Sequence, residues 1–244
     1  MMTEKKYLIE IATADLETTR QAVQGGADRI ELCANLGEGG TTPAYGTLRR
    51  CRELFEVPIF PIIRSRSGDF LYGDDEYHSM QYDIEIVKSL GFEGVVIGML
   101  LVNGQIDLSR TAALRELAYP MEVTFHRAFD RCSDPVKALE ELISIGIDRV
   151  LTSGQALTAP EGVECIAALQ SQANGRIVVM PGSGVRPDNL SELKDKTGCY
   201  EFHTSLRGWK ESKMQFRHPN FKQSVESYRN PNIEAEQVRR MKGD

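Results

Sequence analysis

Residues 25–32 read GGADRIEL, and the same arrangement returns as LGFEGVVI at residues 90–97 and as IGIDRVLT at residues 145–152. In each stretch a glycine stands two residues before an acidic residue, and an apolar run begins shortly afterwards. Glycine readily adopts the left-handed conformation that ends a helix and turns the chain. Each stretch therefore predicts the same joint, at which a helix ends and a strand starts.

Along the whole chain, short runs rich in β-branched residues occur eight times, and helix-like segments separate them. The runs begin at Tyr7, Arg29, Pro58, Gly94, Met121, Arg149, Arg176 and Tyr200. Strict alternation of strands and helices predicts a parallel sheet. Eight units in a chain of roughly 250 residues fit closure into a TIM-type (β/α)8 barrel of the α/β class. A doubly wound open sheet is the alternative.

The chain of 244 residues is interpreted as a single TIM-barrel domain over residues 1–244. The barrel is expected to occupy about residues 7–208. A polar C-terminal extension, residues 209–244, is poor in strand-forming residues, and we expect it to hold a long loop followed by a helix from about Asn232 to Lys242. No stretch resembles an interdomain linker.

Composition argues against several classes of protein. The formal net charge of −6 comes without a basic stripe, which argues against nucleic acid as a partner. The first ten residues lack a signal-peptide pattern, and no run approaches the ~20 apolar residues of a membrane span, so no membrane partner is expected. The five cysteines are odd in number and scattered, which suits reduced thiols and a cytoplasmic location. No nicotinamide or flavin fingerprint is present.

Polar residues early in the strands predict a structural network. In a closed barrel the strand face that packs on helices is apolar, so alternating polar residues should face the lumen. In MEVTFHR, residues 121–127, this rule sends Glu122, Thr124 and His126 inward. Arg29, Glu122 and Glu201 lie early in their strands, near the barrel floor. Because buried charges must be paired, we expect these three to form an ion-pair network.

A second group of polar residues lies late in the strands, at the face where TIM barrels carry their active sites. It comprises Glu31, Arg64, His126 and His203, and Glu10 is expected either near the top or in mid-lumen. A carboxylate facing an imidazole is an acid/base pair, and a nearby arginine can hold an anionic substrate. These five are therefore candidate catalytic residues. Alternatively, each closes the core through hydrogen bonds, or the His and Glu side chains hold Zn²⁺ or Mn²⁺.

A glycine-rich loop, MPGSGVRPDNL at residues 180–190, follows the seventh predicted strand. Phosphate-binding barrels hold their phosphate in this region, on backbone N–H groups. Gly182, Ser183 and Gly184 are therefore candidate anion-binding residues, assisted by Arg64 and by Ser153 after the sixth strand. The alternative is a plain, flexible turn.

Several stretches of the sequence resemble the CutC family. They are RIELCANLGEGGTTPAYG (29–46), RSRSGDF (64–70), VTFHRAFD (123–130), RVLTSG (149–154) and the glycine-rich loop. The resemblance implies a TIM-type barrel in the cytoplasm, a homodimer or higher homo-oligomer, and a part in copper homeostasis through Cu(I) binding, a role disputed for bacterial members. It implies no settled catalytic reaction. Ser65 and Ser67 depart from the family's more common R-P-R-G-G-D-F.

Copper as a bound ion enters only through this resemblance. Cu(I) favours two or more converging sulfur ligands, and the sequence has neither a C-x-x-C motif nor a closely spaced group of methionines. Cys33, at the end of the second strand, is the one cysteine that we nominate as a metal ligand. The alternative is a structural role in the core. The alternative function is a TIM-barrel enzyme or binder that takes a small anionic or phosphorylated substrate at the C-terminal face of the barrel.

Overall fold

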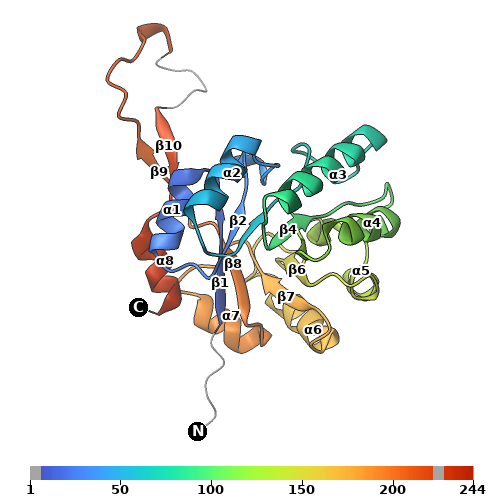
Figure 1. The fold of residues 1–244 in the computed structure, drawn as a ribbon. Helices are drawn as coiled ribbons and strands as arrows, with labels where there is room; N and C mark the ends of the chain where they lie inside the picture. Colours follow the sequence, from blue (N-terminus) through green and yellow to red (C-terminus); the bar gives the residue numbers. More distant parts are fainter. Residues whose placement is uncertain (1–6, 222–227, 244) are drawn as a thin grey trace.

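Eight parallel strands form the centre of a TIM-type (β/α)8 barrel in the computed structural model, which describes residues 7–221 and 228–243 (Figure 1). The predicted fold class and all eight predicted strands are thereby confirmed. The strands are β1 (Leu8–Thr13), β2 (Arg29–Leu32), β3 (Ile59–Pro61), β4 (Gly94–Ile97), β5 (Glu122–Phe125), β6 (Arg149–Thr152), β7 (Val178–Pro181) and β8 (Glu201–Thr204).

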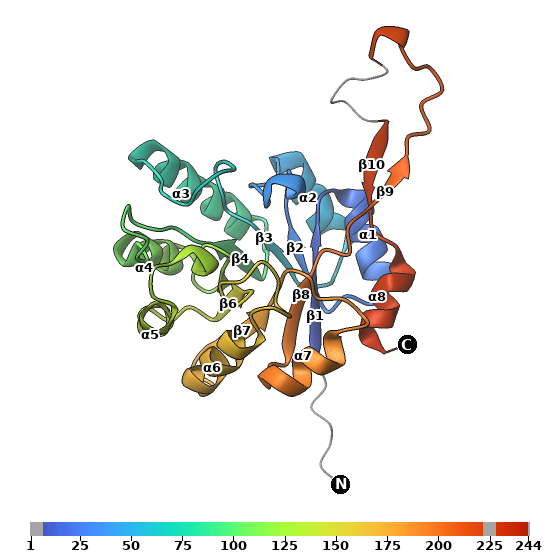
Figure 2. The ribbon, with the colours of Figure 1, turned by 180° about the vertical axis from the view of Figure 1, so that it is seen from behind.

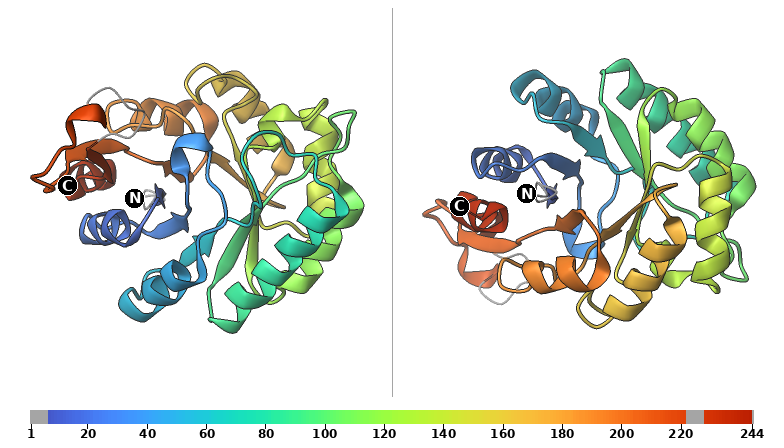
Figure 3. Two further views of the ribbon diagram at one scale, coloured as in Figure 1. Left: turned by 90° about the horizontal axis from the view of Figure 1, so that it is seen from above. Right: turned by 90° about the horizontal axis from the view of Figure 1, so that it is seen from below.

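Helices connect the strands and surround them, as the views along the barrel show (Figure 3). They are α1 (Leu16–Gln24), α2 (Tyr45–Leu54), α3 (Asp74–Ser89), α4 (Leu108–Ala118), α5 (Pro135–Ser144), α6 (Val163–Ala173) and α7 (Leu190–Thr197). Short 3₁₀ turns, η1 (Leu36–Glu38) and η2 (Phe129–Arg131), interrupt the loops after β2 and β5. These two loops lie at the face of the barrel that carries the candidate site.

Backbone hydrogen bonds divide the barrel into two four-stranded arcs, with the orders β3-β2-β1-β8 and β4-β5-β6-β7. A parallel bridge between Ile62 and Val96 joins the end of β3 to β4. On the other side β7 packs beside β8, and no hydrogen-bonded ladder joins these two strands in the described part of the chain. The parallel order brings the carboxyl ends of all eight strands to one face.

The three repeated joints have the predicted backbone geometry. Gly26, Gly91 and Gly146 have φ angles of 87°, 77° and 73°, in the left-handed region that favours glycine. The acid two residues later has a role that the sequence did not predict, because it accepts a hydrogen bond from the start of the preceding strand. The pairs are Asp28 with Ile9 N–H (2.7 Å), Glu93 with Ile59 N–H (3.0 Å) and Asp148 with Val123 N–H (2.8 Å).

Side chains alternate along the strands as expected. Ile9, Val123 and Phe202 are fully buried in the apolar layer between strands and helices. A smaller apolar cluster, separate from that layer, consists of Cys33, Phe60, Ile62 and Val96. The polar residues at the intervening strand positions are therefore left to the lumen.

The C-terminal extension differs in part from the predicted long loop. β9 (Gly208–Glu211) and β10 (Arg229–Asn232) pair as an antiparallel hairpin that projects away from the barrel (Figures 1 and 2), and η3 (Pro219–Phe221) lies between them. The predicted terminal helix is α8 (Ala235–Lys242), whose Val238 packs closely against Gly25. Within the described ranges no helix has the length and apolarity to cross a membrane. Residues 1–6, 244 and 222–227, the last within the predicted loop, lie outside the described residues.

Candidate functional site

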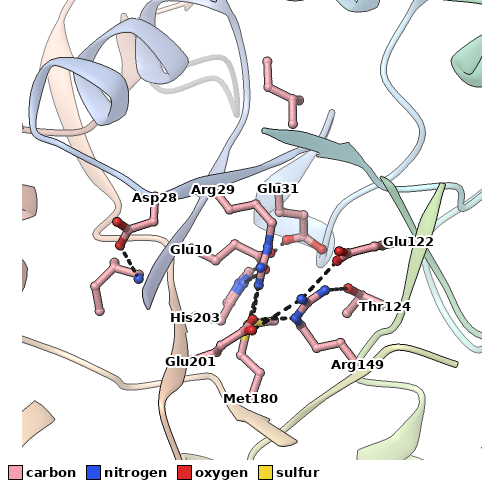
Figure 4. Close-up of polar contacts among 12 residues, drawn as sticks. Glu10, Asp28, Arg29, Glu31, Glu122, Thr124, Arg149, Met180, Glu201 and His203 are labelled. Carbon is pink, nitrogen blue, oxygen red and sulfur yellow. Dashed lines mark hydrogen bonds and ion pairs between the residues drawn. The ribbon is translucent and has the colours of Figure 1, made fainter. Parts of the chain in front are cut away.

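A buried ion-pair network forms the floor of the barrel (Figure 4). Arg29 contacts Glu10 and donates to Glu201 at 2.7 Å, and Arg149 donates to Glu201 at 2.5 Å. Both guanidinium groups also lie over the Phe60 ring, at 5.1 and 5.6 Å from its centroid. The predicted pairing of Arg29 and Glu201 is therefore confirmed.

Two details of the predicted floor need correction. Glu122 is not buried, because 52% of its side chain is exposed and its contact with Arg149 is 3.2 Å long. Arg149, which the sequence analysis did not nominate, is the central partner instead. The repeated joints contained a signal for it, since Arg149 follows Asp148 as Arg29 follows Asp28.

Above the floor, Glu10, His203 and Glu31 form a chain of three side chains from β1, β8 and β2. The register pairs Glu10 with both Arg29 and His203 across the neighbouring strands. Glu10 Oε1 lies 2.8 Å from His203 Nδ1, and Glu31 Oε2 lies 3.7 Å from His203 Nε2 (Figure 4). The imidazole is thus held between two carboxyl groups, which is the geometry that the predicted acid/base role requires.

Charge and burial set different protonation states within this chain. Burial alone would raise the pKa of Glu10, but the charge of Arg29 and the hydrogen bond from His203 hold that pKa well below its usual range. Burial disfavours a charged His203, yet the hydrogen bond to Glu10 and the charge of Glu31 raise its pKa. Burial, followed by the charge of Glu10, raises the pKa of Glu31 despite the opposing charge of His203. Glu10 is therefore the fixed anion, and Glu31 and His203, whose pKa values are both raised, are the candidate proton-transfer groups.

An inner cavity of about 610 Å³ opens above this chain at the carboxyl ends of the strands. Glu31 and His203 line it together with four arginines, Arg64, Arg127, Arg131 and Arg207. A volume of this size suits a small organic ligand. The cavity therefore combines groups that transfer protons with groups that hold an anion.

His126 also lines the inner cavity, but its environment makes it a poor base. Burial, together with the charge of Arg64, lowers the pKa of His126 to about 3. Its Nδ1 accepts the Ala128 N–H at 3.1 Å, which leaves the ring proton on Nε2. Nε2 is buried and has no acceptor among the described residues. His126 is therefore a neutral imidazole whose N–H donor is unused.

Arg64 serves the loops rather than an open anion site. One nitrogen of its guanidinium donates to Gly40 O at 2.7 Å and Glu38 O at 3.2 Å, and another donates to Gly68 O at 2.8 Å. The group also lies over the Phe70 ring, 5.0 Å from its centroid. Because its terminal nitrogens are engaged by carbonyls, Arg64 fastens the loops after β2 and β3 over the mouth of the barrel.

The predicted anion-binding loop is only partly available to a ligand. Gly182 N–H donates to Thr152 O at 2.9 Å, and Ser153 N–H and hydroxyl both donate to Asp130. These donors are therefore occupied within the protein. Ser183 and Gly184 have left-handed φ angles of 74° and 73°, and their N–H groups have no acceptor among the described residues. They are the part of the predicted loop that could receive an anion.

Sequence reasoning missed the cluster that positions Arg127. The buried Asp130 accepts hydrogen bonds from Thr152 Oγ1 at 2.6 Å, from Ser153 N–H at 2.9 Å and from Arg127 Nε at 2.7 Å. Arg127 Nη2 also donates to Ser153 Oγ at 2.8 Å. The guanidinium is thus fixed at the wall of the inner cavity. The RAFD spacing, which puts Arg127 three residues before Asp130, was the available signal.

Cys33 has surroundings unlike those of a Cu(I) ligand. Its thiol is 1% exposed, and burial followed by the charge of Glu31 raises the pKa of Cys33 well above its usual range. Its apolar neighbours include no second cysteine or methionine. Across the described residues, no group of three or more His, Cys, Asp or Glu side chains is arranged to hold a metal ion. The donor set therefore does not fit a site built from converging sulfurs.

Comparison with known proteins identifies the family. The model of the CutC family matches residues 7–208. The chain belongs to the CutC family. A CutC-family protein of Chromobacterium violaceum is 47% identical over 238 residues, covering 96% of each chain. A human relative named copper homeostasis protein cutC homolog is 46% identical over 211 residues, covering 86% of this chain and 77% of the relative.

A solved CutC structure agrees with the fold. The crystal structure of the CutC protein from Streptococcus agalactiae matches with a TM-score of 0.78 at 31% identity, covering 82% of this chain and 98% of that one. The family resemblance and the barrel expected from the sequence are both confirmed. The names of the human and Streptococcus agalactiae relatives carry the association with copper homeostasis, and they specify no reaction.

Proposed function

We propose that this CutC protein binds a small anionic molecule in the inner cavity and catalyses a proton transfer on it. The observation that carries this proposal is the buried chain Glu10–His203–Glu31, which ends at the inner cavity beside fixed arginines. A protein that only needed a stable core would gain more from apolar side chains at these positions, because burying charges is costly.

Each residue has a distinct part in the proposed reaction. Glu10, which Arg29 holds in place, fixes the His203 ring and favours its protonated form. Glu31, whose pKa is raised by burial and which therefore holds a proton more readily than an ordinary carboxylate, takes the proton from the bound molecule. Arg127, fixed by Asp130, holds the anionic group and stabilises negative charge that develops on the ligand.

Deuterium exchange provides the test. Small phosphorylated and carboxylated sugars, hydroxy acids and oxo acids would be screened by thermal shift, and each binder followed by NMR in D₂O with catalytic amounts of protein. We expect at least one binder to exchange a carbon-bound proton. Arg127→Gln should weaken its binding by about tenfold, and Arg50→Gln, which changes an exposed arginine of α2, should leave it unchanged. Absence of any binder, or binding without exchange, would contradict the proposal.

Cu(I) binding is a second candidate, favoured by the names of the CutC relatives. Because Cys33 is buried, protonated and without a second sulfur, we expect Cys33→Ser to change Cu(I) affinity no more than Cys165→Ser does. Competition with a Cu(I) chelator measures both affinities. A selective loss in Cys33→Ser would establish the copper site and overturn this expectation. The cytoplasmic location and homo-oligomeric state that the family implies stay predictions.

A further inference from the structure

A second cavity adjoins the inner one on the outer side of β7 and β8. This outer cavity has a volume of about 550 Å³ and shares Gly184, Thr204, Ser205 and Arg207 with the inner cavity. It is bounded by the loop after β7, the segment after β8 and the face of α8 that carries Gln237 and Arg240. A ligand could therefore extend from the inner cavity into the outer one.

Three arginines from separate parts of the chain surround the outer cavity. They are Arg186 in the loop after β7, Arg207 after β8 and Arg240 on α8. Asp188 is the one acidic residue among the described lining residues. The concentration of positive charge is notable because the chain as a whole carries a net charge of −6. Such an arrangement attracts anions to this position.

These arginines lack the partners that other arginines have. Among the described residues, the side chains of Arg186 and Arg240 make no hydrogen bond or ion pair, and Arg207 makes one hydrogen bond, to Leu36 O at 2.9 Å. Arg239, the neighbour of Arg240 on α8, instead pairs with Glu236 at 3.1 Å. The guanidinium groups of Arg186 and Arg240 are therefore free for a ligand, and Arg207 keeps the donors that do not contact Leu36.

The backbone beside Arg186 adds further donors. Gly184 lines both cavities and Ser183 lines the inner one; both have left-handed φ angles, and their N–H groups have no acceptor within the described ranges. Successive N–H groups in such turns can form a concave anion site. A carboxylate is satisfied by one guanidinium, whereas three guanidinium groups with backbone donors match a phosphate dianion with three terminal oxygens.

We propose that the outer cavity binds the phosphate group of a phosphomonoester whose remaining part enters the inner cavity. This inference rests on the proposed function, because it supplies the substrate class for the same site. Arg186, Arg207 and Arg240 bind the phosphate, and Glu31 and His203 act on the part of the molecule that reaches the lumen. Ser205 and Arg207, which line both cavities, lie where the two parts of the ligand join.

Isothermal titration of the full chain with inorganic phosphate and with methyl phosphate tests this assignment. We expect both probes to bind, and Arg186→Gln and Arg240→Gln each to weaken binding by about tenfold. Arg239→Gln is the matched control on α8 and should bind the probes as the wild type does. Arg127→Gln shows instead whether the probes enter the inner cavity. Thermal unfolding of each variant checks the fold.

The outcomes separate this inference from the proposed function. Failure of the wild type to bind either probe, an equal loss in Arg239→Gln, or a loss confined to Arg127→Gln would overturn the outer phosphate site. Proton exchange on an unphosphorylated ligand would then still support the proposed function. Conversely, probe binding that depends on Arg186 and Arg240, without proton exchange on any ligand, would support the phosphate site and contradict the proton transfer.

Discussion

Replacement of Arg149 by methionine is expected to lower the free energy of unfolding by about 3–5 kcal/mol, because it removes one of the two arginines that neutralise the buried Glu201 carboxylate. Arg149 is 4% exposed, and its guanidinium donates to Glu201 at 2.5 Å and to Thr124 Oγ1 at 3.2 Å. Methionine fills a similar volume but offers no donor to the carboxylate. Equilibrium denaturation in urea, followed by circular dichroism, measures the loss.

A matched variant at the surface shows whether the loss of stability depends on the burial of the ion pair. Arg176 pairs with both carboxylate oxygens of Glu140 at 2.8 Å, but both side chains are about half exposed, so Arg176→Met should change stability little. The double variant Arg149→Met with Glu201→Met should recover part of the loss, because it removes one charge of each sign and leaves Arg29 paired with Glu10. Equal losses in Arg149→Met and Arg176→Met would show that the floor network contributes no more than a surface ion pair.

The barrel could be predicted from sequence because its signals are local. A glycine that ends a helix, an acid and an apolar run lie within eight residues of each other in each repeated joint, and the structure has left-handed glycines at all three. Strand periodicity then fixes which side chains face the lumen. That rule correctly brought Glu10, Glu31 and His203 together, although they are far apart in the sequence.

Roles that depend on partners distant in the sequence could not be predicted in the same way. Arg64 was expected to hold an anion, but its donors meet carbonyl groups of two loops whose paths no local pattern specifies. The partner of Arg149 is Glu201, which is 52 residues away. By alternation Glu122 lies on the same side of β5 as Thr124, yet it is half exposed, whereas Glu201, which is also the first residue of its strand, is buried. The alternation of side chains along a strand predicts the direction of a side chain, but it does not predict how deeply that side chain is buried.

The hairpin of the C-terminal extension shows a different limit. Its strands include RNPN, in which asparagine and proline are poor strand formers, so propensity predicted a loop. The backbone pairing of Arg229–Asn232 with Gly208–Glu211 overrides that preference. The terminal helix α8 was predictable because it has an amphipathic pattern, with Val238 and Met241 buried on one face.

Glu31→Gln is expected to lower the rate of ligand proton exchange by about 10²–10⁴-fold, the usual contribution of a general base. The amide keeps the size of the side chain at the inner cavity and removes its ability to take a proton. Glu53→Gln, on the exposed face of α2 beside Arg49 and Arg50, is the matched control and should exchange at the wild-type rate. The measurement is the NMR exchange rate in D₂O with the binder identified by thermal shift.

Stability should respond to Glu31→Gln in the opposite direction from activity. Because burial raises the pKa of Glu31, the folded protein binds a proton at this carboxyl group more tightly than the unfolded chain does. The stability that this contributes is present near and below the ordinary carboxyl pKa, and it is lost as pH rises through the raised pKa. The variant has no such loss. At pH 8 its free energy of unfolding should therefore equal that of the wild type or exceed it by about 1 kcal/mol. The difference between the two should be smaller at pH 5. A variant that loses both exchange and stability at pH 8 would instead make Glu31 a structural member of the network.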